Sequence, residues 1–268
     1  MKFGITANPE HKHALDATRQ AIRLLKRRHE VILEDGVAKA LRRRGWPLEK
    51  VRADVIMAIG GDGTVLRALQ MTNRKVLGIN AGSVGFLAEG DLDSLESTIG
   101  RLAEGRYHVE ERLRLKVMIG GRRFHDCLNE AVVHTAQVAK IRHYEIRVDG
   151  IVAEQVRADG IIVATPTGST SYSMSAGGPI LDPRVKALVV AAIAPFKPSF
   201  HPFVVPAKSK IQVSFVRPRP GLVVLDGQHE IPLEGSEKVL ITQSEKPAKL
   251  IRFSDNFYKR IQEKLANP

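Results

Sequence analysis

The hydrophobic pattern of the chain changes near Gly105, and this change limits the folds that it can adopt. Before Gly105, short apolar runs alternate with segments whose mostly apolar residues recur every three or four positions and form one helical stripe, as at Leu15, Thr18, Ile22 and Leu25. Such a recurrence is typical of helices that bury one face. Strands that alternate with helices predict a parallel sheet covered by helices on both sides.

The elements of this first part follow from its apolar runs and its glycines. "DVIMAIG" is apolar almost throughout, as expected of a strand that is covered on both faces. The pattern predicts strands over residues 2–8, 30–35, 54–60 and 75–80. It predicts helices over residues 14–28, over 37–45 with Gly45 closing the helix, from residue 64 onward, and over 92–105.

After Gly105 the apolar residues alternate with period two, which is the pattern of half-buried strands. Leu115, Val117 and Ile119 show this alternation and lead into a turn at the next two glycines. Asp149-Gly150 lies between two alternating runs and predicts a two-residue hairpin turn. The same pattern returns in the later apolar runs up to residue 243. This part of the chain is therefore expected to be mostly antiparallel β.

These patterns predict an α/β domain over residues 1–105 and a β-rich domain over 106–250. A final helix within 251–268, starting near Ser254 or Asp255, is expected to return to the first domain. No long linker joins the domains, an arrangement that favours a ligand cleft between them.

Composition narrows the class of protein. The 268 residues are 43% hydrophobic and 26% charged, as in soluble globular proteins, and no run of eighteen apolar residues predicts a membrane span. The first residues, "MKFGITANPEHK", do not predict a secretory signal, and the single cysteine, Cys127, excludes an intrachain disulfide framework. We therefore expect a cytoplasmic protein. A net charge of +12 favours polyanionic partners such as nucleotides, polyphosphate or nucleic acid, although clusters such as "LRRRG" also suit solvated helix faces.

The most informative loop is "GGDGT", at the end of the third predicted strand. Gly60, Gly61 and Gly63 allow a sharp turn and a close approach of a ligand to the backbone. Amide groups beside a helix N-terminus form an anion site, and Thr64 is placed to cap that helix. The spacing matches neither the Walker A motif nor G-x-G-x-x-G. The alternative is an ordinary strand-to-helix turn in which Asp62 is the cap.

Two further stretches are unusually polar for their positions. Eight hydroxyl residues gather within 157–180 and suit a sugar or phosphate ligand, or alternatively a polar surface turn: Thr165, Thr167, Ser169, Thr170, Ser171, Tyr172, Ser173 and Ser175. Asn129 and Glu130 begin a β pattern where apolar residues would be expected, so they belong either to a site or to a turn.

Together, these motifs resemble those of NAD kinases. The family has a GGDGT loop, a downstream Asn-Glu pair and a TPTGSTAY-type segment that ends in AGGPI, and all three occur here in that order. Further similarity covers residues 80–87, 193–195, 204–206 and 225–228, so the resemblance extends over nearly the whole chain. The chain departs from the family pattern at Ser171, where alanine is usual, and at His201, where arginine often precedes the proline.

The resemblance implies a phosphofructokinase-like (Rossmann-like) α/β domain, a β-rich domain and transfer of a phosphoryl group to the 2′-hydroxyl of the adenosine ribose of NAD. Asp62 would be the general base or would orient that hydroxyl, and Mg²⁺ would arrive with the nucleotide instead of at a dedicated metal site. The donor would be ATP or polyphosphate. The family also implies a homodimer or homotetramer with nucleotide ligands and neither nucleic-acid nor membrane partners.

By the same resemblance, residues can be assigned to each ligand. Donor phosphates would contact Gly60, Gly61, Gly63 and Thr64. NAD would contact Asp62, Gly63, Phe86, Asn129, Glu130, Arg157, Asp159, Thr167, Thr170, Tyr172 and Ala194, with Asp226 and Gln228 as further candidates. Within that set, Asn129 and Glu130 would hold the adenosine, while Asp159 would bind at the nicotinamide end. Phe86 and the hydroxyl-rich segment would line the adenine.

Three other functions share some of these features. A lipid or sugar kinase of the same superfamily would have the GGDGT loop but would not need the hydroxyl-rich segment. A basic nucleic-acid-binding module would explain the net charge, but the chain is only 5% aromatic and has no recognised binding motif. A catalytically inactive NAD sensor would not need Asp62.

Overall fold

The computed structural model describes residues 1–82, 85–137, 139–196 and 200–265. The chain divides into two compact units, one of Met1–Glu111 with Ala248–Pro268 and the other of Arg112–Pro247. The expected fold class is confirmed, since a parallel α/β unit and a β-rich unit are both present and the C-terminal helix belongs to the first.

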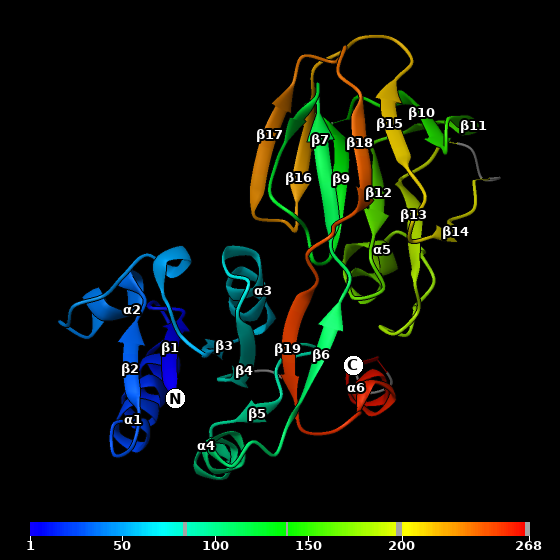
Figure 1. Ribbon diagram of the computed structural model, residues 1–268. Coiled ribbons are helices and arrows are strands. Elements are labelled where there is room, and N and C mark those ends of the chain that lie inside the picture. The colour runs from blue at the N-terminus through cyan, green and yellow to red at the C-terminus, as the bar shows by residue number, and fades with distance from the viewer. Residues whose placement is uncertain (83–84, 138, 197–199, 266–268) are drawn as a thin grey trace. The chain divides into compact units, whose positions relative to one another are not determined.

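The first unit is built on a seven-stranded sheet (Figure 1). Its strands lie in the order β2 (Glu30–Leu33), β1 (Lys2–Ala7), β3 (Val55–Gly60), β4 (Lys75–Asn80), β19 (Ala248–Arg252) and β6 (His108–Arg112), with the short β5 (Gly90–Asp91) also paired to β4. The pairs from β2 through to β19, and the β4–β5 pair, are parallel. The sheet therefore has the parallel centre that the first part of the sequence predicts.

Helices cover both faces of this sheet. The helices of this unit are α1 (Lys12–Leu25), α2 (Asp35–Ala40), α3 (Asp62–Met71), α4 (Leu95–Ala103) and α6 (Phe257–Leu265), with a 3₁₀ turn, η1, at Leu48–Lys50. Leu77 and Ile79 of β4 share a core with residues of α1 and α4. Gly78, between them, faces α3 so closely that an added Cβ would lie 2.8 Å from a methyl group of Val65. Every residue of β3 is buried, as its apolar run predicts.

Several helix ends differ from the expectation. Helix α3 begins at Asp62, so Thr64 lies inside its first turn, and Gly61 occupies the N-cap without any side-chain cap. The prediction that Thr64 caps this helix is therefore wrong. Helix α2 ends at Ala40, well before Gly45, because the chain turns back at Arg42 and Gly45 packs against Ala38. Helix α6 starts at Phe257, slightly later than expected.

The second unit contains two six-stranded sheets, and all of their recorded pairings are antiparallel. One has the order β11 (Ile151–Ala158), β10 (Arg142–Val148), β15 (Ile211–Phe215), β18 (Val239–Gln243), β7 (Leu115–Ile119) and β8 (Arg122–Arg123). The other has the order β14 (Phe203–Pro206), β13 (Ala187–Ile193), β12 (Gly160–Ala164), β9 (Glu130–Thr135), β16 (Gly221–Leu225) and β17 (His229–Leu233). A single core draws residues from both sheets, including Tyr144 from one and Val163 from the other.

The outer face of the second sheet is covered by the hydroxyl-rich segment. Ile162 and Val189 belong to a smaller apolar cluster against which Ala176 and Leu181 pack. The segment contains a 3₁₀ turn, η2 (Gly168–Thr170), and the short helix α5 (Tyr172–Ser175). It is therefore an ordered part of the fold and not a surface turn.

Two local predictions for this unit are confirmed. Asp149 and Gly150 have φ values of +51° and +87° and join β10 to β11 in a two-residue hairpin. Gly120 and Gly121 also have positive φ and join β7 to β8.

The boundaries between the units differ from those expected at residues 105 and 250. Strand β6 lies after Gly105 and strand β19 begins at Ala248, yet both belong to the sheet of the first unit. The residues of β6 (His-Val-Glu-Glu-Arg) and β19 (Ala-Lys-Leu-Ile-Arg) carry no local signal for the unit to which they belong, so the change of pattern near Gly105 does not locate the boundary. In the described part of the chain, no helix combines the length and the apolar character needed to cross a bilayer.

Candidate active site

The glycine loop joins β3 to α3 in a conformation that requires glycine at one position. Gly60 has φ +156°, and a Cβ there would lie 2.4 Å from the Thr64 hydroxyl oxygen. A Cβ on Gly61 or Gly63 would meet no atom within 4 Å. Packing inside the protein therefore explains Gly60, whereas Gly61 and Gly63 border open space beside the N-terminus of α3, where a ligand can approach the backbone closely.

That open space is a cavity of about 430 Å³, lined by Ala7, Asn8, Pro9, His11, Gly61, Gly63, Thr64 and Arg67. The first four residues follow or end strand β1, which pairs directly with β3. Ligands of open α/β sheets bind at the carboxyl ends of such strands. Sequence reasoning predicted Gly61, Gly63 and Thr64 but missed Asn8, His11 and Arg67, although the end of β1 was a signal that could have identified Asn8 and His11.

Arg67 is held in place at this cavity by a buried acid. Its Nη2 lies 2.8 Å from Glu34 Oε1, and its Nη1 donates to Thr6 Oγ1 at 3.4 Å. The Glu34 side chain is 7% exposed and also accepts from the amide of Val37 at the start of α2. The guanidinium remains partly exposed, so it offers positive charge at the cavity in a fixed orientation.

Asp62 is oriented by a loop that follows β4. Its Oδ2 accepts a hydrogen bond from the amide of Phe86 at 2.7 Å, and its Oδ1 accepts one from the amide of Leu87 at 3.0 Å. The approach is close enough that a Cβ on Gly85 would lie 1.9 Å from Asp62 Oδ1. Asp62 is therefore not the helix cap of the alternative interpretation. Ser83 and Val84, within the "NAGSVGFL" motif, lie outside the described residues.

The carbonyl side of this loop is held by two buried arginines. The Phe86 carbonyl accepts from Arg260 Nη1 at 2.6 Å, and the Leu87 carbonyl accepts from Arg252 Nη1 at 3.0 Å. Glu89 pairs with both arginines, at 2.6 Å to Arg260 and 3.0 Å to Arg252. Burial, and then the charge of Arg252, lower the pKa of Arg260, while Glu89 opposes this effect. We call Glu89, Arg252 and Arg260 the arginine clamp; sequence reasoning missed all three residues.

In the second unit, Asp226 organises the Asn-Glu pair. Its two carboxylate oxygens accept from the amides of Leu128 and Asn129, both at 2.7 Å, and from that of Glu130 at 3.0 Å. The Asp226 side chain is buried, and its φ of +50° starts the turn between β16 and β17. Asp226 thus positions the predicted site residues through their backbone. Gln228 lies exposed in the same turn, where its backbone N–H donates to the Leu225 carbonyl.

Glu130 is a buried acid with a strongly altered affinity for its proton. Burial, and then the negative charge of Asp226, raise the pKa of Glu130 to about 8, and a hydrogen bond from Ser171 opposes the shift. Its Oε2 accepts no hydrogen bond within the described part of the chain. Near neutral pH the group is therefore largely protonated and has a proton to donate.

The hydroxyl-rich segment meets the Asn-Glu pair directly. The Thr165 amide donates to the Asn129 carbonyl at 2.8 Å, and the Thr165 hydroxyl donates to the Leu128 carbonyl at 2.5 Å. Gly168 approaches so closely that a Cβ would lie 2.2 Å from the Asn129 carbonyl oxygen. Two motifs 36 residues apart in sequence, Asn129 and Thr165, thus lie together as the resemblance implies.

Not every hydroxyl of this segment is available to a ligand. Ser169 and Ser173 are fully buried, and Ser169 binds backbone groups at Pro166 and Leu181. Thr167 is nearly buried and accepts from Arg112 at 3.1 Å. Thr170 is partly exposed and Tyr172 is 42% exposed.

The remaining predicted NAD residues lie at the other end of strand β12. The Asp159 amide donates to the Ile193 carbonyl, directly before Ala194, and the Arg157 guanidinium lies over the Phe196 ring at 4.9 Å. Ala194 is exposed with φ +46°. The strand has five residues between these ends, so roughly 15 Å separates them. The predicted set therefore forms two groups in this unit, separated by the length of β12.

Comparison with known proteins identifies the family. The family model of the ATP-NAD kinase N-terminal domain matches residues 3–107, and that of the ATP-NAD kinase C-terminal domain matches residues 128–253. An NAD kinase of Thermoplasma volcanium is 41% identical over 99% of this chain and 98% of its own. One from Methanothermobacter thermautotrophicus is 42% identical, over 99% and 96% respectively.

Solved structures agree with this result. An NAD kinase of Archaeoglobus fulgidus, solved in complex with ATP, has a TM-score of 0.81 and 32% identity over 99% of this chain and 98% of its own. Yeast NADH kinase complexed with NADH has a TM-score of 0.90 over 100% of this chain and 88% of its own, and at 24% identity it shows the shared fold alone. The chain belongs to the NAD kinase family, whose members phosphorylate NAD to NADP.

Proposed function

We propose that this NAD kinase takes ATP as its phosphoryl donor at the cavity beside the glycine loop. The observation that carries the proposal is the combination, in one cavity, of open glycine amides at a helix N-terminus and the fixed guanidinium of Arg67. A triphosphate needs such a combination of backbone donors and positive charge. The ATP complex of the Archaeoglobus fulgidus relative supports the choice of donor.

We assign the alignment of the acceptor to Asp62. The 2′-oxygen of the adenosine ribose attacks the γ-phosphorus of ATP, the bond from that phosphorus to the β,γ-bridging oxygen breaks, and ADP leaves. The hydroxyl proton passes to the Asp62 carboxylate. A carboxylate is a weak base toward a sugar alcohol, so it acts late, when the new bond has made the hydroxyl acidic. Because the amides of Phe86 and Leu87 fix both of its oxygens, Asp62 contributes orientation as well as proton transfer.

We assign NAD recognition to the two groups of residues in the second unit. Asn129 and Glu130 hold the adenosine ribose, and the neutral form of Glu130 supplies a hydrogen-bond donor there. Thr170 and Tyr172 face the adenine, whereas Thr167 supports the segment through Arg112. Asp159, with Arg157 and Ala194, is assigned to the nicotinamide end, and Phe86 to packing on the adenine. The separation along β12 suits a ligand as long as a dinucleotide.

The expected Mg²⁺ has no protein cage of its own in the described residues. Among these residues, no group of three or more histidine, cysteine, aspartate or glutamate side chains is arranged to bind a metal ion. Both oxygens of Asp62 already accept hydrogen bonds from backbone amides. We assign Mg²⁺ to the triphosphate, where it would offset the charge of the transferring group. We also propose a cytoplasmic homodimer or homotetramer without nucleic-acid partners, and light scattering on the purified protein measures its oligomeric state.

Steady-state kinetics with Arg67 variants tests the donor site. Arg67→Lys keeps a charge opposite Glu34 but loses the forked geometry, so we expect the KM for ATP to rise roughly tenfold while the KM for NAD stays within about twofold. Arg74→Lys is the matched control, since that arginine is exposed on the same unit. An unchanged KM for ATP in Arg67→Lys contradicts the proposed donor cavity. Replacing ATP by polyphosphate in the wild-type assay decides between the two donors.

A further inference from the structure

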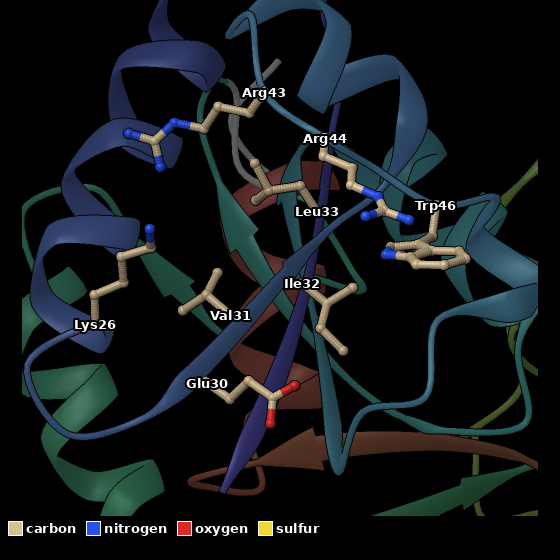
Figure 2. A pocket seen from close by; sticks show the side chains of 8 residues that line it. All are labelled: Lys26, Glu30, Val31, Ile32, Leu33, Arg43, Arg44 and Trp46. Carbon is tan, nitrogen blue, oxygen red and sulfur yellow. The ribbon is translucent and has the colours of Figure 1, made fainter.

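A second cavity of the first unit lies at the edge strand of the sheet and shares no lining residue with the donor cavity. It encloses about 540 Å³, within the range of small-molecule sites. Figure 2 shows its basic side chains around strand β2, with Lys26 and Arg43 toward one side and Arg44 beside Trp46 on the other. None of these four residues has a role in the proposed reaction.

The charge of this cavity is strongly positive. Within the ranges that the structure describes, no carboxylate forms an ion pair with Lys26, Arg43 or Arg44. The acid that lines the cavity, Glu30, is already paired with Lys2 at 3.0 Å. Three cations therefore surround a concave surface without a counter-charge of their own, which favours an anionic ligand.

The cavity also has an ordered aromatic wall. The Trp46 amide donates to the Leu33 carbonyl, and the Trp46 carbonyl accepts from the Asp35 amide, both at 3.0 Å. These bonds hold the backbone of Trp46 against the edge of β2, while the residue as a whole stays 45% exposed. The Arg44 guanidinium lies 5.1 Å from the ring centroid. A large aromatic side chain anchored through its backbone and left exposed offers a stacking surface at low entropic cost.

Strand β2 adds backbone hydrogen-bonding groups to the cavity. The amides of Glu30 and Glu34 donate to the β1 side, at Met1 and Ile5, whereas the Leu33 carbonyl faces Trp46. Because successive residues of a strand direct their backbone groups to opposite edges, Val31 directs its N–H and C=O to the same edge as Leu33. Trp46 forms its backbone hydrogen bonds with Leu33 and Asp35, at the end of this edge. Val31, earlier in the strand, lines the cavity. A donor and an acceptor therefore lie in the same cavity as the indole.

We propose that this cavity is a second nucleotide site that takes a purine nucleoside diphosphate. The base stacks on Trp46 and meets the exposed backbone groups of Val31, and the diphosphate is bound by Lys26, Arg43 and Arg44. The three elements of the site match the three parts of such a ligand: a planar ring, a polar ring edge and a compact anion. The site does not depend on the assignments made for the donor cavity.

The fluorescence of Trp46 provides a specific test, because it is the only tryptophan in the chain. We expect ADP to quench Trp46 emission saturably in the full-length protein. Adenosine, which lacks the phosphates, should bind at least tenfold more weakly, and pyrophosphate should displace ADP without quenching. Arg43→Gln/Arg44→Gln should raise the Kd for ADP measured at Trp46 by at least tenfold while leaving NAD kinase activity unchanged.

Arg52→Gln/Arg74→Gln is the matched control, since it removes the same charge from exposed positions outside the cavity and should keep the wild-type quenching. Absence of quenching at ADP concentrations that inhibit the kinase overturns the proposal. So does quenching that survives in Arg43→Gln/Arg44→Gln, since the signal would then come from another site. Equal affinity for pyrophosphate and ADP also overturns it, because the cavity would then be a plain anion site.

Discussion

At the residue scale, the acids of this enzyme differ more in their environment than in their chemistry. The carboxylate oxygens of Asp62 and Asp226 accept hydrogen bonds from backbone amides, so each of these carboxylates is held in one orientation. Asp62 lies half-buried in the glycine loop, whereas Asp226 is buried and binds the backbone amides of the neighbouring Asn129 and Glu130. Glu130, in contrast, is buried with one oxygen that no described group satisfies.

The buried Glu130 predicts a pH dependence of stability. The pKa of Glu130 is raised from its ordinary value of 4.5 to about 8 in the folded chain, mainly by burial. The folded state therefore holds a proton that the unfolded state loses, so this group makes stability fall as pH rises from about 4.5 to about 8. Glu130→Gln keeps a neutral group and removes that slope. We expect the variant to gain on the order of a few kcal/mol relative to wild type between pH 5 and pH 8.

Urea unfolding at pH 5, 6.5 and 8 measures this effect. Glu234→Gln is the control, because that side chain is exposed and its variant should follow the wild-type curve at each pH. Parallel pH profiles for wild type and Glu130→Gln would mean that Glu130 titrates normally in the folded protein.

The candidate site residues could be selected from local sequence motifs, whereas the partners that hold them could not. Gly60, Asn129 and Thr165 belong to short motifs whose composition carries its own signal. The partners of Asp62 lie 24 and 25 residues away, and Glu34, the partner of Arg67, lies 33 residues away. Such contacts depend on which strands become neighbours, and local patterns do not contain that information.

At the element scale, the loop from Gly85 to Glu89 links Asp62 to the C-terminal elements of the first unit. Its amides hold Asp62, and its carbonyls are held by Arg252 at the end of β19 and Arg260 on α6. The C-terminal elements thus act on Asp62 through one loop. We infer that the arginine clamp positions the carboxylate without contacting the nucleotides.

Arg260 variants test this role. Arg260→Met removes the donors to Phe86 and Glu89, so we expect kcat to fall roughly tenfold with little change in the KM for ATP. Arg260→Lys should restore part of kcat, because one donor remains. Lys259→Met removes the same charge from an exposed position on the same helix and should keep wild-type kinetics. A kcat for Arg260→Met equal to that of wild type would exclude the positioning role.

Element types were more predictable than element ends and partners. The run from Val55 to Gly60 is a buried strand because its residues are apolar throughout, and this property is local. The last residue of α2 and the first residue of α6 depend on packing and on the path of the adjoining chain. The signals at Gly45 and Ser254 therefore placed these two helix ends incorrectly. Strands β6 and β19 lie at the two borders of the β-rich part of the sequence but pair in the sheet of the first unit, and these pairings depend on distant partners.

At the scale of the whole molecule, each unit has a hydrophobic core of its own. The first unit also includes the C-terminal segment of the chain, which follows the second unit in sequence. Leu250 and Ile251 of β19 are buried in the first unit. The burial of each side chain contributes roughly 1.5–3 kcal/mol to the stability of this unit. The C-terminal segment that contains β19 and α6 also supplies both arginines of the arginine clamp. The first unit therefore depends on residues that follow the entire β-rich unit.

Truncation tests this dependence. A chain that ends at Pro247 should lose the thermal transition of the first unit, since it lacks β19 and α6. The fragment Arg112–Pro247 contains both of its sheets and should unfold in one cooperative transition. Calorimetry of the two truncated chains and the full chain measures these transitions. A full-length profile from the chain that ends at Pro247 would contradict the assigned division of the cores.

The central claim is that Asp62, held by the amides of Phe86 and Leu87, aligns the 2′-hydroxyl of NAD for attack on ATP. The most direct test is the rate of NADP formation by Asp62→Asn, together with its affinity for NAD by calorimetry and with Asp93→Asn as an exposed control on the same unit. We predict that the rate falls by about 10²–10⁴-fold while the Kd for NAD changes by less than about threefold. Turnover at the wild-type rate by a folded Asp62→Asn enzyme would contradict the claim.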